Sequence, residues 1–292
     1  MLRYIIRKRE EEEIAVVSGA DALPAALTLP AVYDGRPVRV IGAKAFAGRQ
    51  ELKEIRLPDS VDTLEGFAFH NCKSLQSITL HDSVTDYHDG VIRAATALRR
   101  IHVTVHRDNY LPVSRMLSDS DATLTFDLAL PDGEARLTFP GFLYDFTENT
   151  MARVIQFNIT GSGMAFRECV SKNGMDYEAY DRLFERALLD GISIISDVAF
   201  GRLMCPYRLS ERAKDSYETY LRRHGGKILG ELIAGEDTEK IRFYAARDLI
   251  TKEALGSALE TAAKQNRTEI TALLMAREGA LHSGRQNKAM TL

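Results

Sequence analysis

The chain has 292 residues, of which 45% are hydrophobic and 27% charged, and its formal net charge is −3. This length allows about two domains of ordinary size. A small net charge without a dominant basic stripe argues against broad nucleic-acid binding.

Targeting signals and disulfides are not indicated. The chain lacks the run of about 18 apolar residues that a membrane-spanning helix requires. It begins with MLRYIIRKREEEE, which has charge but no apolar core typical of a secretory signal. The three cysteines are irregularly spaced and do not suggest a disulfide framework. These features predict a cytoplasmic protein, and an extracellular location would require that a leader had been removed.

The first forty residues predict the cap of a repeat structure. Residues 4–6 and 14–17 are predicted strands around the charged turn RKREEEE, which would be solvated and would discourage edge-to-edge pairing. Residues 26–30, ALTLP, match the IRLP of the repeats that follow and predict a further strand. Residues 33–37, YDGRP, supply a turn between them.

Residues 38–106 contain three copies of one unit, at residues 38–60, 61–83 and 84–106. Seven positions are apolar in every copy: Val38/Val61/Val84, Ile41/Leu64/Tyr87, Ala45/Ala68/Val91, Phe46/Phe69/Ile92, Leu52/Leu75/Leu98, Ile55/Ile78/Ile101 and Leu57/Leu80/Val103. A fixed period of this length predicts a solenoid, in which each unit buries its apolar face against its neighbours.

Each unit carries one short alternating segment, Ile55-x-Leu57 in the first copy, that predicts a strand with one face inward. Stacked units would place these strands side by side in a parallel sheet, about 4.8 Å apart. The outward residues then form three rows: Glu54, Ser77 and Arg100; Arg56, Thr79 and His102; Pro58, His81 and Thr104.

These outward rows have two interpretations that the sequence leaves open: a surface for a partner, or an ordinary solvated sheet face. On the first interpretation the partner is another protein, of unknown identity. The candidate binding residues are Glu54, Arg56, Ser77, Thr79, His81, Arg100 and His102. The sequence leaves the oligomeric state open.

The repeat pattern I/L-G-x-x-A-F, then L-x-x-I-x-L-P-x-S-V, resembles the BspA-type leucine-rich repeats over about residues 26–106. The first copy carries it at Ile41-Gly42, Ala45-Phe46, Leu52, Ile55, Leu57-Pro58 and Ser60-Val61; the second carries it at Ala68-Phe69, Cys72, Leu75, Ile78, Leu80 and Ser83-Val84. The third has Val91-Ile92 and Ala95 instead, which suggests that the solenoid ends there. The resemblance implies a binding module without catalysis, and many family members are surface-exposed.

After residue 106 the period is lost, and a hairpin is predicted. Residues 124–130 alternate in hydrophobicity, Pro131-Asp132-Gly133 is a strong turn signal, and residues 135–139 can pair back. This hairpin either covers the last repeat or begins the next domain. Further along, residues 154–157 favour a strand that ends at Gly161.

From Asp176 onward the sequence predicts helices. Asp176 is expected to cap a helix that ends at Gly191. Its apolar stripe would consist of Tyr180, Leu183, Phe184, Ala187 and Leu188. A short helix at 197–204 would stop before Pro206.

Another predicted helix begins at Ser210 and closes at His224-Gly225-Gly226. Its inward residues would be Tyr217, Tyr220 and Leu221. Residues 258–280 resemble the helix pair of an ankyrin repeat, and a similar pair precedes them by roughly thirty residues. The Thr-Pro-Leu-His opening of ankyrin units is absent, so a generic antiparallel helical array is equally compatible.

Catalytic and metal-binding patterns are weak. Cys169 follows Arg167, which could lower the pKa of its thiol, although burial in a core is the simpler interpretation. Cys72 and Cys205 are also expected to be buried. A zinc site is not indicated by the spacing of His70, Cys72, His81 and His88. A calcium site is not indicated by the spacing of Asp82, Asp86 and Asp89. No catalytic, cofactor-binding or metal-binding residue is therefore predicted.

Together these observations predict an α+β chain with a solenoid at residues 1–110, a β-hairpin connector at 111–145 and a mainly helical domain at 146–284. The predicted function is a non-catalytic protein-protein interaction or scaffold module that uses the sheet face and the helical array. Two alternatives are an enzyme with a site in residues 142–207, where Arg167, Glu168 and Cys169 would converge, and a surface adhesin if a leader is missing.

Overall fold

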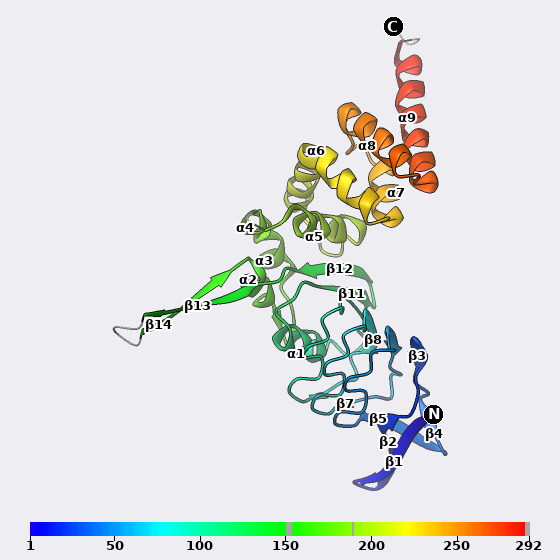
Figure 1. Ribbon diagram of the computed structural model, residues 1–292, viewed down its shortest axis with the longest axis vertical. Helices are drawn as coiled ribbons and strands as arrows, with labels where there is room; N and C mark the ends of the chain where they lie inside the picture. The colour runs from blue at the N-terminus through cyan, green and yellow to red at the C-terminus, as the bar shows by residue number, and fades with distance from the viewer. Residues whose placement is uncertain (150–153, 189, 290–292) are drawn as a thin grey trace. The chain divides into compact units, whose positions relative to one another are not determined.

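The computed structural model describes residues 1–149, 154–188 and 190–289. The chain forms two compact units (Figure 1). The first consists of Met1–Asp190 and Cys205–Arg208, and the second of Gly191–Met204 and Leu209–Leu292.

One sheet of the first unit begins with the predicted N-terminal cap. Its strands follow the order β1 (Leu2–Arg9), β2 (Glu12–Ala20), β5 (Arg36–Ile41), β7 (Thr63–Leu64) and β9 (Asp86–Tyr87), and β4 (Val32–Tyr33) pairs with β5. β1 and β2 are antiparallel, and the strands from β2 to β9 are parallel. The two predicted N-terminal strands are confirmed, but they extend through most of the charged run, so only Glu10 and Glu11 form the turn.

The second sheet contains the predicted repeat strands. Its order is β3 (Ala26–Thr28), β6 (Glu54–Arg56), β8 (Ser77–His81), β10 (Arg100–Thr104), β11 (Leu124–Leu130) and β12 (Gly133–Phe139). Every pair is parallel except β11 and β12. The predicted hairpin therefore covers the last repeat, because β11 pairs directly with β10.

The apolar repeat positions form the core between these two sheets. All seven predicted positions are buried in all three copies. The rings of Phe46 and Phe69 stack with their centroids 5.5 Å apart and an interplanar angle of 4°. Equivalent residues of successive units therefore pack on each other, as the solenoid prediction requires.

Each turn of the solenoid contains two residues with left-handed backbone. Lys44, Phe67 and Gly90 occupy the first position with φ of 58°, 61° and 70°; Gly48, Asn71 and Ala94 occupy the second with 73°, 58° and 61°. Such angles suit glycine and strain most other residues. Hydrogen bonds between units hold the turns, for example from the amide of Phe46 to the carbonyl of Ala68.

Helix α1 (Leu111–Asp119), which the sequence analysis did not predict, caps the last turn. In earlier units the amides of this turn donate to carbonyls of the following unit. In the third unit, the amide of Gly90 donates to Asp119 Oδ1 at 2.9 Å and that of Ile92 to Asp119 Oδ2 at 3.4 Å. The hydroxyl of Tyr87 donates to the same carboxylate. Asp119 thus replaces the acceptors that a fourth unit would supply.

The first unit ends with small elements after the solenoid. They are β13 (Leu143–Asn149), β14 (Val154–Thr160), α2 (Gly163–Arg167), β15 (Val170–Ser171), β16 (Gly174–Met175), α3 (Tyr177–Arg182) and α4 (Phe184–Ala187). The predicted strand at 154–157 is confirmed, and it ends before Gly161, whose φ is 99°.

The helix predicted after Asp176 is only partly correct. The side chain of Asp176 accepts from the amide of Ala179, as a cap should. However, the helix breaks at Leu183, which separates α3 from α4, and Leu188 is 48% exposed. The predicted continuous helix is therefore wrong, but most of its stripe is buried: Tyr180, Phe184 and Ala187 are in the core, whereas Leu188 is not.

The second unit is helical, with α5 (Ile192–Met204), α6 (Glu211–Ala234), α7 (Thr238–Ala246), α8 (Lys252–Lys264) and α9 (Thr268–Ala289). The side chain of Ser210 accepts from the amide of Ala213 and caps α6, as predicted. The helix at 197–204 starts earlier than predicted, at Ile192. None of the described helices is long and apolar enough to cross a membrane.

The predicted helix end at residues 224–226 is wrong, because α6 continues to Ala234. Tyr217 and Leu221 are buried as predicted, whereas Tyr220 is partly exposed. Gly225 lies on the packed face of α6, where an added Cβ would be 3.0 Å from the hydroxyl of Tyr244. The glycine therefore permits close helix packing and does not terminate the helix.

Two helix pairs in this unit have equivalent turns. Glu236 precedes α7 and Asn266 precedes α9, and both have left-handed backbone, with φ of 55° and 56°. An ion pair between Arg267 and Glu236 joins the two turns. The helices thus form a short regular array, which is compatible with both alternatives left open by the sequence.

Candidate binding face of the repeat sheet

The outward rows lie in the register that the repeats predict. Glu54 pairs with Ser77 and Ser77 with Arg100; Arg56 pairs with Thr79 and Thr79 with His102. His81 pairs with Thr104 in the third row. Because side chains alternate along a strand, the residues between these rows point into the core and the rows themselves point outward.

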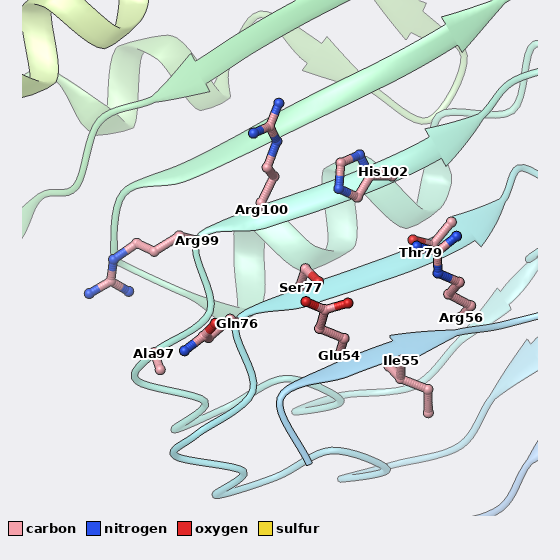
Figure 2. Close-up of a pocket in the computed structure, with 10 residues that line it drawn as sticks. All are labelled: Glu54, Ile55, Arg56, Gln76, Ser77, Thr79, Ala97, Arg99, Arg100 and His102. Carbon is pink, nitrogen blue, oxygen red and sulfur yellow. The ribbon is translucent and has the colours of Figure 1, made fainter. Parts of the chain in front are cut away.

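These rows line a hollow of about 810 Å³ on the outer face of the sheet (Figure 2). Its walls are Glu54, Ile55, Arg56, Gln76, Ser77, Thr79, Ala97, Arg99, Arg100 and His102. Figure 2 shows the candidate side chains rising from three neighbouring strands, β6, β8 and β10. Every candidate binding residue except His81 is in this wall, so these six residues share one continuous surface.

The same face extends onto β11, which the sequence analysis missed. The pairing of β10 with β11 places Thr125, Asp127 and Ala129 beside Arg100, His102 and Thr104. The sequence does contain a pattern that indicates this position, because the alternation of residues 124–130 points Asp127 away from the core. What the sequence could not supply was the pairing of β11 with β10.

Asp127 accepts hydrogen bonds from side chains of the candidate face. Arg100 Nε donates to its Oδ2, and Arg136 Nε donates to its Oδ1 at 2.6 Å. The Nδ1 of His102 is 3.1 Å from Oδ2. Two candidate binding residues therefore have a partner inside the molecule.

These contacts control the charge of Asp127, whose side chain is only 19% exposed. Burial by itself would raise the pKa of this carboxyl. The hydrogen bonds from His102, Arg100 and Arg136 outweigh burial and hold the pKa far below its usual range. Asp127 is therefore ionised at neutral pH and compensates the neighbouring cations.

The part of the face on β6 and β8 differs. The side chains of Glu54, Arg56, Ser77 and Thr79 make no hydrogen bond or ion pair with any residue that the structure describes. Arg99, at the start of β10, donates only to the nearby carbonyls of Thr96 and Leu98. We call the residues of β6 and β8 the open part of the face, and those around Asp127 the closed part.

A smaller hollow of about 260 Å³ lies over the closed part. Its lining comprises Arg100, His102, Val103, Thr104, Asp127, Leu128, Ala129, Glu134, Ala135, Arg136 and Cys205. It shares Arg100 and His102 with the larger hollow, so the two are adjacent on one surface.

His81 lies near a different charged group at the end of β8. Its Nδ1 is 3.7 Å from Asp59 Oδ1. Arg107 donates to both oxygens of Asp59 at 2.9 Å, and these hydrogen bonds lower the pKa of that carboxyl. The buried Asp82 accepts from the amides of His106 and Arg107 and from the Arg107 guanidinium, so it stabilises the chain that leaves the solenoid.

No metal site is formed by the described residues: within 1–149, 154–188 and 190–289, no three His, Cys, Asp or Glu side chains are placed to hold an ion. Cys72 is buried in the solenoid, where its Sγ donates to the carbonyl of Phe46 at 2.9 Å. Burial raises the pKa of this thiol. Cys205 is partly exposed, contrary to the predicted burial.

The suggestion that Arg167 lowers the pKa of Cys169 is wrong. Burial, followed by the charges of Asp176 and Glu168, raises that pKa to about 11. The guanidinium of Arg167 instead donates to backbone carbonyls at residues 117, 122, 140 and 163. Since a thiol with this pKa is protonated at neutral pH, Cys169 is not an activated nucleophile.

Comparison with protein families gives a match for the repeats. The model of the BspA type leucine rich repeat region matches residues 31–109, in six copies. None of the curated proteins matches.

Solved structures of bacterial leucine-rich repeat proteins are also similar. A leucine rich cell surface protein from Faecalibacterium prausnitzii A2-165 is 19% identical, with a TM-score of 0.30, over 45% of this chain and 43% of that one. The Leucine Rich Repeat protein of T. pallidum is 20% identical, with a TM-score of 0.24, over 35% and 68%. A leucine-rich repeat protein from Bacteroides ovatus ATCC 8483 is 17% identical, with a TM-score of 0.23, over 36% and 48%. The chain thus spans less than half the length of the first of these proteins.

Proposed function

Because residues 31–109 form a BspA-type leucine-rich repeat region, we propose that this chain is a non-catalytic protein-binding module. Its partner lies on the sheet face around Arg56, Thr79 and His102. Leucine-rich repeats stack into extended concave surfaces that suit protein ligands. The site consists of the seven residues predicted from the repeat register, with Asp127 as a supporting residue.

The observation that carries this proposal is the contrast between the two sheets of the solenoid. On the first sheet, several exposed charges pair across strands: Arg7 with Glu65 at 2.7 Å and Arg9 with Asp62 at 2.7 Å. On the second sheet, Glu54 and Arg56 line a hollow and have no ion pair among the described residues. Charged groups that line a hollow without an internal ion pair are available for the electrostatic complementarity by which an interface selects its partner.

The enzyme alternative is weakened by the environment of Cys169. Its thiol has a raised pKa, and Arg167 is engaged by backbone carbonyls. The three residues expected to converge on a catalytic pocket therefore do not form one reactive group.

The helical array is a second surface of the same functional class. The matching turns at Glu236 and Asn266 indicate stacked helix pairs, and such stacks commonly bind proteins. The scaffold role of the whole chain is thus a proposal in which two repeat surfaces hold partners, with the sheet face as the main one.

The proposal is tested by affinity capture from a lysate of the source cell. We compare the wild-type chain with an Arg56→Glu/Thr79→Glu variant, and identify bound proteins by mass spectrometry. Lys8→Glu is the matched control, because Lys8 is an exposed cation on β1, outside the face. His102 is left intact since it contacts Asp127.

We expect a protein that binds the wild type and the Lys8→Glu chain but not the double variant. A protein captured equally by all three chains would move the site to the helical array. Circular dichroism melting of each variant shows whether the fold is retained, so that loss of binding is not confused with unfolding.

A further inference from the structure

The wall of the larger hollow carries more cations than carboxylates, although the chain as a whole is acidic. This wall contains the cations Arg56, Arg99 and Arg100 and a single carboxylate, Glu54. Arg100 is paired with Asp127 of the closed part, so Arg56 and Arg99 are the cations that an external group can reach. The formal net charge of the chain is −3. A local excess of cations in a hollow concentrates the positive potential there and attracts anionic groups.

The closed part shows what kind of group this sheet face binds. Arg100, His102 and Arg136 surround the carboxylate of Asp127, which is largely removed from water. Hydrogen bonds between guanidinium and carboxylate are charge-assisted and are among the strongest that proteins make. The molecule therefore already contains one carboxylate bound on the outward rows.

Arg56 occupies the same row as this bound carboxylate. The row runs Arg56, Thr79, His102, Asp127 and Arg136 across five neighbouring strands. Strands are about 4.8 Å apart, so Arg56 lies roughly 10 Å from His102 and 15 Å from Asp127 along the row. Thr79 is paired with Arg56, and Ser77 lies in the next row beside Glu54. Both supply hydroxyl donors that no described residue uses.

From this arrangement we propose that the hollow binds an acidic peptide segment of the partner protein, and that Arg56 receives one of its Asp or Glu side chains. The hydroxyl of Thr79 adds a hydrogen bond to the same carboxylate, Ser77 offers a further donor in the next row, and Arg99 provides a second cation at the edge. This inference rests on the proposed function and specifies the chemistry of the partner. The charge complementarity of the face selects an acidic segment over a neutral or basic one.

The proposal also predicts an effect of Asp127, in the closed part, on the binding of acidic peptides. Asp127 competes with an external carboxylate because it neutralises Arg100 and Arg136. Replacing it with asparagine keeps the shape of the side chain but removes the negative charge that both guanidinium groups contact. The Asp127→Asn chain is therefore expected to bind acidic peptides more tightly than the wild type.

The experiment selects peptides from a random library displayed on phage, using the full chain as bait. The most enriched peptides are synthesised with a fluorescent label, and their affinity is measured by anisotropy at low and at physiological salt. The same peptides are titrated with Arg56→Gln, Asp127→Asn, Ser77→Trp and the control Lys8→Gln. Ser77→Trp fills the hollow, and melting curves confirm that each chain is folded.

We expect peptides rich in Asp and Glu, with affinity at least about tenfold lower for Arg56→Gln, since a hydrogen bond to a charged group is lost. Their affinity should rise for Asp127→Asn, fall as salt screens the charges, and stay unchanged for Lys8→Gln. Enriched peptides without acidic residues that are still lost with Ser77→Trp would overturn this inference and leave the proposed function standing. Peptides that bind the Ser77→Trp chain as tightly as the wild type, or a selection that enriches nothing, would overturn both this inference and the proposed function.

Discussion

The open and closed parts of the sheet face are built from the same repeat rows, yet their side chains have different roles. In the closed part, Arg100 and His102 contact Asp127 within the molecule. In the open part, Glu54 and Arg56 line a hollow without any such contact among the described residues. Equivalent positions of a solenoid can thus stabilise the fold in one unit and remain available to a partner in another.

The difference follows from what lies beside each strand. β10 is followed by β11, which contributes Asp127 to the row of His102. β6 lies between β3 and β8, and these strands contribute only Ala26, Thr28, Ser77 and Thr79 at the positions that face Glu54 and Arg56. A row of the solenoid is therefore closed where the chain leaves the repeat pattern and open where the pattern continues.

The largest expected loss of stability comes from a substitution in the core beneath both parts of the face. Phe69→Ala should lower the free energy of unfolding by about 3 to 5 kcal/mol, because it opens a cavity beside Phe46 in the middle of the stack. Thermal and urea unfolding measure this loss. A melting temperature equal to that of the wild type would contradict the packing of the repeats.

The next two substitutions compare the stability that a carboxylate contributes in the closed part and in the open part. Asp127→Ala should cost about 1 to 3 kcal/mol, since it leaves Arg100 and Arg136 without their common acceptor. Glu54→Ala, the matched removal of a carboxylate in the open part, should change stability by less than about 0.5 kcal/mol. Urea titrations compare the two variants. Equal losses would show that the open and closed parts do not differ as described.

The stability that Asp127 contributes should depend on pH. The pKa of Asp127 is lowered in the folded protein by His102, Arg100 and Arg136, so its contribution to stability is complete above the unfolded pKa of about 3.9. That contribution is lost as the pH falls from there toward the lower folded pKa. The stability difference between the wild type and Asp127→Asn should therefore shrink below about pH 4. Urea titrations at several acidic pH values test this, and a difference that does not change with pH would contradict it.

The smallest expected effect on folding belongs to Arg56. Arg56→Glu should leave the free energy of unfolding within about 0.5 kcal/mol of the wild type, because this exposed side chain has no partner among the described residues. Its effect should appear only in binding. A large loss of stability in thermal unfolding would instead assign Arg56 to the fold and remove it from the binding face.

The repeat region was predictable because its information is local and periodic. Apolar residues at seven recurring positions define the inward face, and the strand alternation then determines which residues point outward. This reasoning placed Glu54, Arg56, Ser77, Thr79, Arg100 and His102 around one hollow before any contact was known. Their role as a binding surface remains a prediction that the experiments above address.

The helical unit was less predictable because the same local sequence pattern there is compatible with more than one structure. A glycine pair after a helical stretch usually marks a helix end. In α6 it continues the helix, since Gly225 faces the hydroxyl of Tyr244. Whether a glycine ends a helix or permits close packing depends on the neighbouring helix, which lies about twenty residues away in the sequence.

The sequence by itself determined the solenoid, its register and its outward rows, because each repeat encodes its own turn, strand and buried positions. Only the tertiary structure decided where the solenoid ends and which outward residues are free. The carboxylate of Asp119 completes the last turn, and that of Asp127 binds Arg100 and His102. Both come from segments outside the repeat, and their positions follow from long-range packing that no local pattern records.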